Sequence, residues 1–127
     1  PTLNPNMSFQ EVGQGFVGQY YQFFSTNRPS LAGVYRPNSL MTWSGQQLQG
    51  GDAIMERFAT LGFNQAQFKT EDIDCHPSVS GGVIAVVNGE VAIEGEEHPL
   101  KFNDVFHLAL DQGNNWYISN QLFRIIG

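Results

Sequence analysis

The second half of the chain is dominated by long runs of residues with strand character. Residues 101–110 and 116–126 are two such runs, and both exceed the about five or six residues of an ordinary strand. Residues 83–87 form a third run, and all five are apolar, as in a strand buried on both faces. Strands this long and this apolar predict a large curved sheet with one face packed on helices.

The start of the chain carries the signals of a helix. Residues 8–11, Ser-Phe-Gln-Glu, match a capping box, in which the serine hydroxyl and the glutamate carboxylate each satisfy a backbone N–H. Apolar and aromatic residues then recur at helical spacing, which predicts a helix over residues 8–25. Residues 1–7 lack this period and contain two prolines. We expect them to be a tail, with residues 8–127 forming a single domain.

The remaining elements are predicted from turn residues and short apolar runs. The first half should also contain a short helix over 28–35, strands over 39–44 and 46–49, and a helix that begins at an Asp52 N-cap and stops before Gly62. The second half should add a strand over 63–75 and a hairpin in which Asn88-Gly89 turns 83–87 back along 90–94.

Acidic residues are concentrated in one segment. The chain has six Lys and Arg against twelve Asp and Glu, a net charge of −6, and residues 71–104 hold eight of those acids with one lysine, a net −7. Six basic residues cannot build a broad phosphate-binding face, so we expect no nucleic-acid partner. The acidic segment is a solvated face on the simplest interpretation, and a surface for a basic partner on the other.

Signatures of metal, nucleotide or hydrolytic sites do not occur in the sequence. A single cysteine, Cys75, excludes an intramolecular disulfide and a thiolate zinc cluster. The three histidines, at 76, 98 and 107, lack the spacing of metal ligands. No apolar run is long enough to span a membrane, and the start has no signal-peptide pattern. We therefore expect no cofactor, no metal and no membrane association.

One acidic residue interrupts an apolar strand face. Asp104 has the same strand parity as Phe102, Phe106 and Leu108. It can be paired with a nearby hydrogen-bond donor, or it can have a raised pKa and act in proton transfer. Pairing is the simpler interpretation. The catalytic one would require an acid–base pair, for which Asp74 and Tyr35 are further candidates.

The last run of the chain has apolar residues on both faces of the predicted strand. Tyr117, Phe123 and Ile125 share one parity, and Ile118, Leu122 and Ile126 share the other. One face can pack on the helices, but the other is too apolar to remain in water. We therefore expect two copies of the chain to pack sheet to sheet as a homodimer.

Several motifs resemble the nuclear transport factor 2 family. Residues 39–50, Ser-Leu-Met-Thr-Trp-Ser-Gly-Gln-Gln-Leu-Gln-Gly, are close to the family pattern Leu-Thr-Trp-x-Gly-Gln-Gln-x-x-Gly. Residues 120–124 add Asn-x-x-Phe-Arg, and the similarity extends over residues 8–127. The resemblance implies an α+β homodimer with a cone-shaped fold, in which a curved antiparallel sheet wraps on three helices.

This resemblance also implies a function. Members bind the GDP form of the small GTPase Ran and carry it into the nucleus, crossing the pore by weak contacts with phenylalanine-glycine nucleoporins. The expected protein is not an enzyme, and it is found in the cytoplasm, the nucleus and the nuclear pore or envelope. Two alternatives remain: a small-molecule isomerase or dehydratase on the same fold, and an adaptor that pairs with a larger partner in RNA export.

Matched residue by residue, the resemblance implies a hydrophobic cavity that accepts an aromatic side chain of Ran and is ringed by acids. The cavity residues would be Trp43, Leu61, Phe63, Leu100, Phe102 and Phe123. The acids would be Asp74, Glu94, Glu96 and Glu97, with Glu96 or Glu97 filling one family position. Phe9 matches the nucleoporin-binding aromatic of the first helix. The chain departs from the family at Ser44, where a Ran-binding glutamate is common, and in its longer acidic loop.

Overall fold

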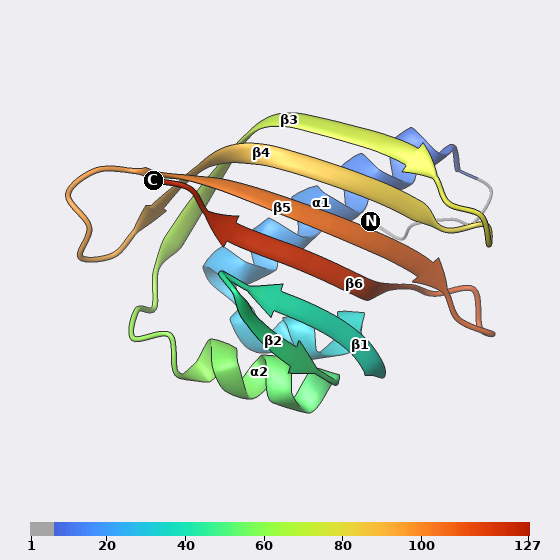
Figure 1. Cartoon of the computed structure of the whole chain (residues 1–127), viewed down its shortest axis with the longest axis horizontal. Coiled ribbons are helices and arrows are strands. Elements are labelled where there is room, and N and C mark those ends of the chain that lie inside the picture. The colour runs from blue at the N-terminus through green and yellow to red at the C-terminus, as the bar shows by residue number, and fades with distance from the viewer. Residues whose placement is uncertain (1–6) are drawn as a thin grey trace.

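The protein is described by a computed structural model over residues 7–127, in which helices lie against one face of a curved six-stranded sheet (Figure 1). Residues 1–6, most of the predicted tail, lie outside the described residues. The elements, in chain order, are α1 (Phe9–Thr26), the 3-10 helix η1 (Arg28–Val34), β1 (Tyr35–Trp43), β2 (Gln46–Gln49), α2 (Gly51–Ala59), β3 (Ala66–Pro77), β4 (Val83–Ile93), β5 (Leu100–Leu110) and β6 (Trp116–Ile125).

The predicted capping box is present at the start of α1. The Glu11 backbone N–H donates to Ser8 Oγ at 3.2 Å, and the Ser8 N–H donates to Glu11 Oε1 at 3.0 Å. One stripe of the helix is buried against the sheet and includes Val12, Phe16 and Phe24. Burial of this stripe stabilises a helix whose glycines weaken it by up to about 1 kcal/mol each.

The sheet is mixed, so the prediction of an antiparallel sheet is wrong at one pair. Its order is β2-β1-β6-β5-β4-β3, and β1 runs parallel to β6, with Leu40 opposite Asn120 and Trp43 opposite Phe123. All other neighbours are antiparallel. The pair joins segments about 80 residues apart in the chain, and the direction of such distant strands leaves no local sequence signal.

The predicted hairpin at Asn88-Gly89 does not form, because β4 continues through both residues. Gly89 lies opposite a bulge in β3, between Thr70 and Asp72, where a Cβ atom would collide with the Lys69 carbonyl oxygen. The glycine therefore serves a close approach between strands, which is the other common role of glycine in a strand.

Several other boundaries differ from prediction. The β1 strand begins at Tyr35 instead of residue 39, and the β3 strand ends at Pro77 instead of residue 75. The N-cap of α2 is Gly50, with φ 89°, and Asp52 lies inside the first turn. The β3 strand begins at Ala66 instead of residue 63. A positive φ is accessible to glycine at little cost, which explains why the chain turns at Gly50.

A register shift in the β5–β6 pair changes which face the residues of β6 occupy. Ile118 pairs with Leu108, whereas Asn120 pairs with His107, so Ser119 is the extra residue of a bulge. Ile118 and Phe123 are consequently both buried, although their sequence parity places them on opposite faces. The outer face of β6 then presents Asn120 and Leu122, which are both exposed.

Candidate functional site

An apolar cavity of about 200 Å³ lies where the end of α1, the end of α2 and one end of the sheet meet. Most of the side chains around it are aromatic or aliphatic, with one arginine. They are Phe24, Trp43, Arg57, Leu61, Phe63, Ala66, Phe68, Val91, Ile93, Phe123 and Ile125. Because an apolar cavity of about 150 Å³ accommodates benzene, this one is large enough for a single aromatic side chain.

Trp43 forms one wall of the cavity. Its ring stacks on Phe123 with centroids 4.4 Å apart and on Phe24 at 6.2 Å. Phe58 contacts it edge-on at 5.5 Å. The parallel pairing of β1 with β6 places Trp43 directly opposite Phe123. This wall is therefore built by the one strand pair whose direction differs from the predicted antiparallel sheet.

Four of the six predicted cavity residues line the cavity: Trp43, Leu61, Phe63 and Phe123. The other two lie outside its lining. Phe102 is only 1% exposed and packs behind it, stacked on Phe123 at 5.8 Å and edge-on to Phe68 at 5.3 Å. Leu100 is half-buried and pairs with Val91, a wall residue.

Sequence reasoning missed several wall residues, among them Phe24, Ala66 and Phe68. Phe24 lies on the apolar stripe of α1, but the stripe does not distinguish a wall residue from a core residue. Ala66 and Phe68 share one strand parity, which places both on the inner face. The sequence therefore contained a signal, the shared strand parity, that identifies Ala66 and Phe68 as inward-facing residues.

The loop between β4 and β5 brings acids to the cavity. Glu94 Oε1 accepts a hydrogen bond from the Asn64 N–H at 2.8 Å, and the Glu94 N–H donates to the Gln65 carbonyl at 3.0 Å. The loop is therefore tied to the segment that follows the wall residue Phe63. Glu94, Glu96 and Glu97 are all exposed, and the Glu96 N–H donates to the carbonyl of the wall residue Ile93 at 3.0 Å, so the loop places acids at this edge of the cavity.

Asp74 does not join the loop acids. It is an exposed residue of β3 that pairs with Val86, six residues beyond the wall residue Phe68. At about 3.3 Å per residue this places it about 20 Å along the strand. The acidic segment of the sequence is thus divided in space among the cavity loop, the far part of β3 and, for Asp104, the core.

Ser44 occupies the tight turn between β1 and β2, with φ 46°, and is followed by Gly45 with φ 93°. Its Oγ accepts from the Ile125 N–H at 3.3 Å, and its N–H donates to the Phe123 carbonyl at 2.7 Å. Ser44 therefore binds the turn to β6 beside Trp43. The charged wall residue on this side is Arg57, which is basic. Its Nε donates a hydrogen bond to Gln46 Oε1 at 2.9 Å.

Asp104 is 1% exposed and hydrogen-bonded inside the core, as its simpler interpretation predicted. Tyr21 Oη donates to its Oδ2 at 2.9 Å, and Gln121 Nε2 donates to its carboxylate at 3.1 Å. Burial raises the pKa of this carboxyl from 3.8 to about 8. Of its two candidate partners in an acid–base pair, Asp74 is distant on β3, whereas Tyr35 lies in the same buried cluster and hydrogen-bonds Gln121, as Asp104 does.

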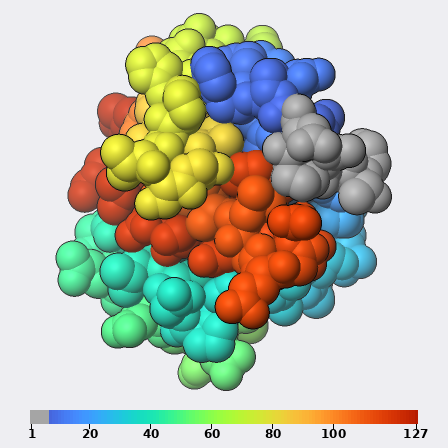
Figure 2. Space-filling model, turned by 90° about the vertical axis from the view of Figure 1, so that its right-hand side faces the viewer, coloured from blue at the N-terminus to red at the C-terminus, as the bar shows by residue number. Residues whose placement is uncertain are grey.

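Two other surfaces bear on the predicted partners. Phe9 is 41% exposed in the first turn of α1, at the end of the molecule opposite the cavity loop, where Figure 2 shows the start of α1 beside the β3–β4 turn. On the outer face of the sheet Leu40 is 48% and Leu122 54% exposed. These two leucines lie along one shallow groove with Thr42 and Asn120.

Between residues 7 and 127, no helix is long and apolar enough to cross a membrane. Over the same residues, no three His, Cys, Asp or Glu side chains are grouped so that they could hold a metal ion.

The fold and the cavity define a class of α+β binding proteins in which a curved sheet and helices enclose an apolar pocket. Comparison with known proteins identifies the family within that class to which the chain belongs. Residues 12–125 match the Nuclear transport factor 2 (NTF2) domain. The chain belongs to the nuclear transport factor 2 family, as the motifs in its sequence predicted.

Individual relatives agree over nearly the whole chain. Nuclear transport factor 2 from Oryza sativa is 39% identical over 94% of this chain and 98% of its own length. Nuclear transport factor 2B from Arabidopsis thaliana is 38% identical over 90% and 91%. The structure of nuclear transport factor 2 from Cryptosporidium parvum has a TM-score of 0.90 and 42% identity, covering 98% of this chain and 100% of that one. These relatives are transport factors, which confirms the prediction of a non-enzymatic protein.

Proposed function

We propose that this chain is a nuclear import carrier that binds Ran-GDP at the cavity, with residues 8–127 acting as a single domain. The observation that carries the proposal is an apolar cavity of single-ring size, walled by Trp43 and Phe123, with an acidic loop at its edge. A buried aromatic anchor supplies most of the affinity in such an interface. The surrounding acids attract a basic partner and select its orientation.

Selectivity for the nucleotide state is the test of this proposal. Ran loaded with GDP should bind the immobilised full chain, and Ran loaded with GTP should bind at least tenfold more weakly, a difference of about 1.4 kcal/mol. Equal binding of both forms, or binding of neither, would reject the import role. It would also reopen the alternatives of an adaptor in RNA export and of a small-molecule enzyme.

Reversing the charge of the loop is expected to weaken Ran-GDP binding. The double substitution Glu94→Lys with Glu96→Lys places two cations where a basic partner must approach, and we expect a loss of about tenfold or more in affinity by calorimetry. Glu94 and Glu96 are both exposed, so the overall fold should be retained, with the loss of the hydrogen bond that Glu94 accepts from the Asn64 N–H. Glu71→Lys with Asp74→Lys on β3 is the matched control, and an equal loss there would contradict the assignment of the loop.

We propose that Phe9 contributes to a binding site for phenylalanine-glycine nucleoporins. An exposed aromatic ring in the first turn of α1 offers apolar area to the phenylalanine of a repeat. Phe9→Ala should weaken binding of a phenylalanine-glycine repeat peptide about threefold or more, measured by NMR titration. Ile126→Ala removes apolar area from an exposed residue that follows β6, and it should leave the peptide affinity unchanged. An unaltered affinity in Phe9→Ala would place the site elsewhere.

We propose that two copies form a homodimer through the outer face of the sheet. Leu40 and Leu122 are large apolar residues on adjacent strands and about half exposed, which is the kind of patch that marks an interface. Sedimentation at micromolar concentration should give a dimer, and Leu122→Glu should shift it to monomer because two buried carboxylates would oppose each other. A wild-type monomer would contradict this interface.

A carrier of this kind is found in the cytoplasm, the nucleus and the nuclear pore, and we propose the same distribution for this chain. A fluorescent fusion of the full chain should accumulate at the nuclear rim, and the Phe9→Ala fusion should lose part of that signal.

A further inference from the structure

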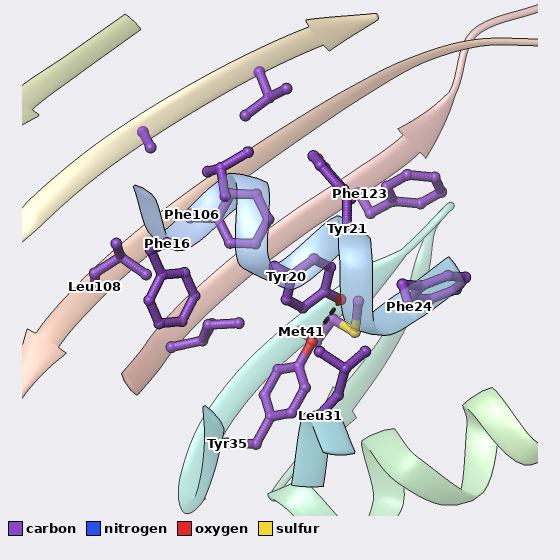
Figure 3. Packing of buried hydrophobic residues seen from close by; sticks show 14 of the residues in the cluster. Phe16, Tyr20, Tyr21, Phe24, Leu31, Tyr35, Met41, Phe106, Leu108 and Phe123 are labelled. Atoms are coloured by element: carbon purple, nitrogen blue, oxygen red, sulfur yellow. Dashed lines mark hydrogen bonds between the residues drawn. The ribbon is translucent and has the colours of Figure 1, made fainter. Parts of the chain in front are cut away.

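A cluster of five buried polar side chains lies in the core behind the cavity: Tyr20, Tyr21, Tyr35, Asp104 and Gln121. None is more than 5% exposed. They come from α1, β1, β5 and β6, and Figure 3 shows the Tyr20 and Tyr35 hydroxyl groups meeting between the helix and the sheet. The proposed binding function uses none of these groups directly.

The hydrogen bonds of the cluster form a closed ring with one branch. Tyr35 Oη donates to Gln121 Oε1 at 2.7 Å, so at the 2.8 Å contact between the two hydroxyls Tyr20 is the donor to Tyr35. Gln121 Nε2 donates to Tyr20 Oη at 3.3 Å, which closes the ring. The branch is the second N–H of Gln121, which donates to Asp104.

Counting protons shows that the cluster suits an ionised Asp104. The three hydroxyls and the amide supply five hydrogens, and each is used once when Tyr21 also donates to Asp104. A proton on the carboxyl adds a sixth hydrogen. It competes with the Tyr21 hydrogen for the single 2.9 Å contact between Tyr21 and Asp104, so with the Gln121 amide nitrogen facing Asp104 the neutral form leaves one O–H without an acceptor in the cluster.

Burial opposes ionisation, so the two forms are closely balanced. It raises the pKa of Asp104 to about 8. The groups that face Asp104 are Tyr20 and Tyr21 from α1, Tyr35 from β1, Gln121 from β6 and the apolar Val87 from β4. Over residues 7–127, no lysine or arginine pairs with it; Arg28 is the cation that acts on the cluster, through Tyr20.

The cluster is in direct contact with the wall of the cavity. The Tyr21 ring stacks on Phe68, a wall residue, with centroids 4.4 Å apart and planes 16° apart. Asp104 lies opposite Phe123, the wall residue that stacks on Trp43. A change in the Tyr21–Asp104 hydrogen bond therefore acts on the back of the wall.

We infer that Asp104 is a positioning residue for the cavity: through Tyr21, the proton on its carboxyl group sets how firmly the wall at Phe68 is held. With the carboxylate ionised, Tyr21 makes a charge-assisted hydrogen bond, which is about twice as strong as a neutral one. With the carboxyl protonated, that bond weakens and Tyr21 is freer to move. The inference rests on the proposed function only in treating this cavity as the binding site.

The fluorescence emission of Trp43 tests this inference in the absence of any binding partner. Trp116→Phe leaves Trp43 as the sole tryptophan, and it removes an indole N–H that has no partner among the described residues. In this background the emission should change sigmoidally with a midpoint near pH 8, over a titration from about pH 6 to about pH 9.5. Asp104→Asn should abolish the step, and Asp74→Asn, the same substitution at an exposed strand position, should retain it.

Tyr21→Phe tests whether Asp104 acts on the cavity wall through the Tyr21 hydroxyl. It also keeps the inference testable if Asp104→Asn fails to fold. The substituted ring can remain stacked on Phe68 but has no hydroxyl, so the emission step should lose at least about half its amplitude. A flat wild-type profile, an unchanged step in Asp104→Asn, or a full step in Tyr21→Phe would each overturn the inference.

Calorimetry with Ran-GDP then measures the consequence for binding. Affinity should rise about threefold more between about pH 7 and about pH 9 in the wild type than in Asp104→Asn. Equal pH dependence in both proteins would overturn the link to binding. Failure of Ran-GDP to bind at any pH would contradict the proposed function, whereas the Trp43 titration would still decide the role of Asp104.

Discussion

Replacing Ala66 with leucine is expected to weaken the binding of Ran-GDP by about thirtyfold or more, which is the about 2 kcal/mol of an interface hot spot. Ala66 is 2% exposed at the start of β3 and lines the cavity opposite Ile93. Three added carbon atoms would occupy the space that the proposal assigns to an aromatic side chain. The charge of the loop would not change, so calorimetry on this variant isolates the contribution of the anchor.

The fold should tolerate this substitution, since the added atoms enter an existing cavity and the usual about 1–3 kcal/mol cost of overpacking is reduced. Ala92→Leu is the matched control, because Ala92 is an exposed alanine of the neighbouring strand, opposite Gln67. It should bind Ran-GDP as the wild type does. Unchanged affinity in Ala66→Leu, with the fold intact by circular dichroism, would show that this cavity does not receive the anchor.

The second large effect is a fall in stability as pH rises, which Asp104 should cause. In the unfolded chain Asp104 loses its proton near its ordinary pKa of 3.8, whereas the folded protein holds the proton until about pH 8. Between these values the unfolded state binds fewer protons, so the free energy of unfolding decreases with pH. The slope approaches about 1.4 kcal/mol per pH unit, and it disappears above the folded-state pKa.

Urea unfolding at a series of pH values measures this slope. Asp104→Asn cannot ionise, so its stability should lose less than that of the wild type between about pH 5 and about pH 8, by a few kcal/mol in total. The other titratable groups are the same in both proteins, so their contribution cancels in the comparison. Parallel stability curves would show that Asp104 is already ionised in the folded protein at neutral pH.

Part of the candidate site follows from the sequence, and individual residues show where the structure departs from what the resemblance implies. Trp43 stands in a motif specific enough to indicate the family, and Phe63 and Glu94 follow from the same alignment. Asp74 was assigned to the same acidic ring, but β3 carries it away from the cavity. Phe102 was assigned to the cavity but packs behind its wall. A residue-by-residue match transfers identity, whereas the distance between two side chains depends on where their strands lie.

The sequence alone determined the features that depend on interactions between neighbouring residues. The capping box at residue 8, the apolar stripe of α1 and the long strands of the second half all reflect interactions between residues close in the chain. Tertiary structure decided the parallel pairing of β1 with β6, the continuation of β4 through Gly89, and the burial of Asp104 against Tyr21, which is 83 residues away. These contacts form only when the sheet closes over the helices. Their free energy comes from packing and desolvation between distant segments, which no local pattern of residues records.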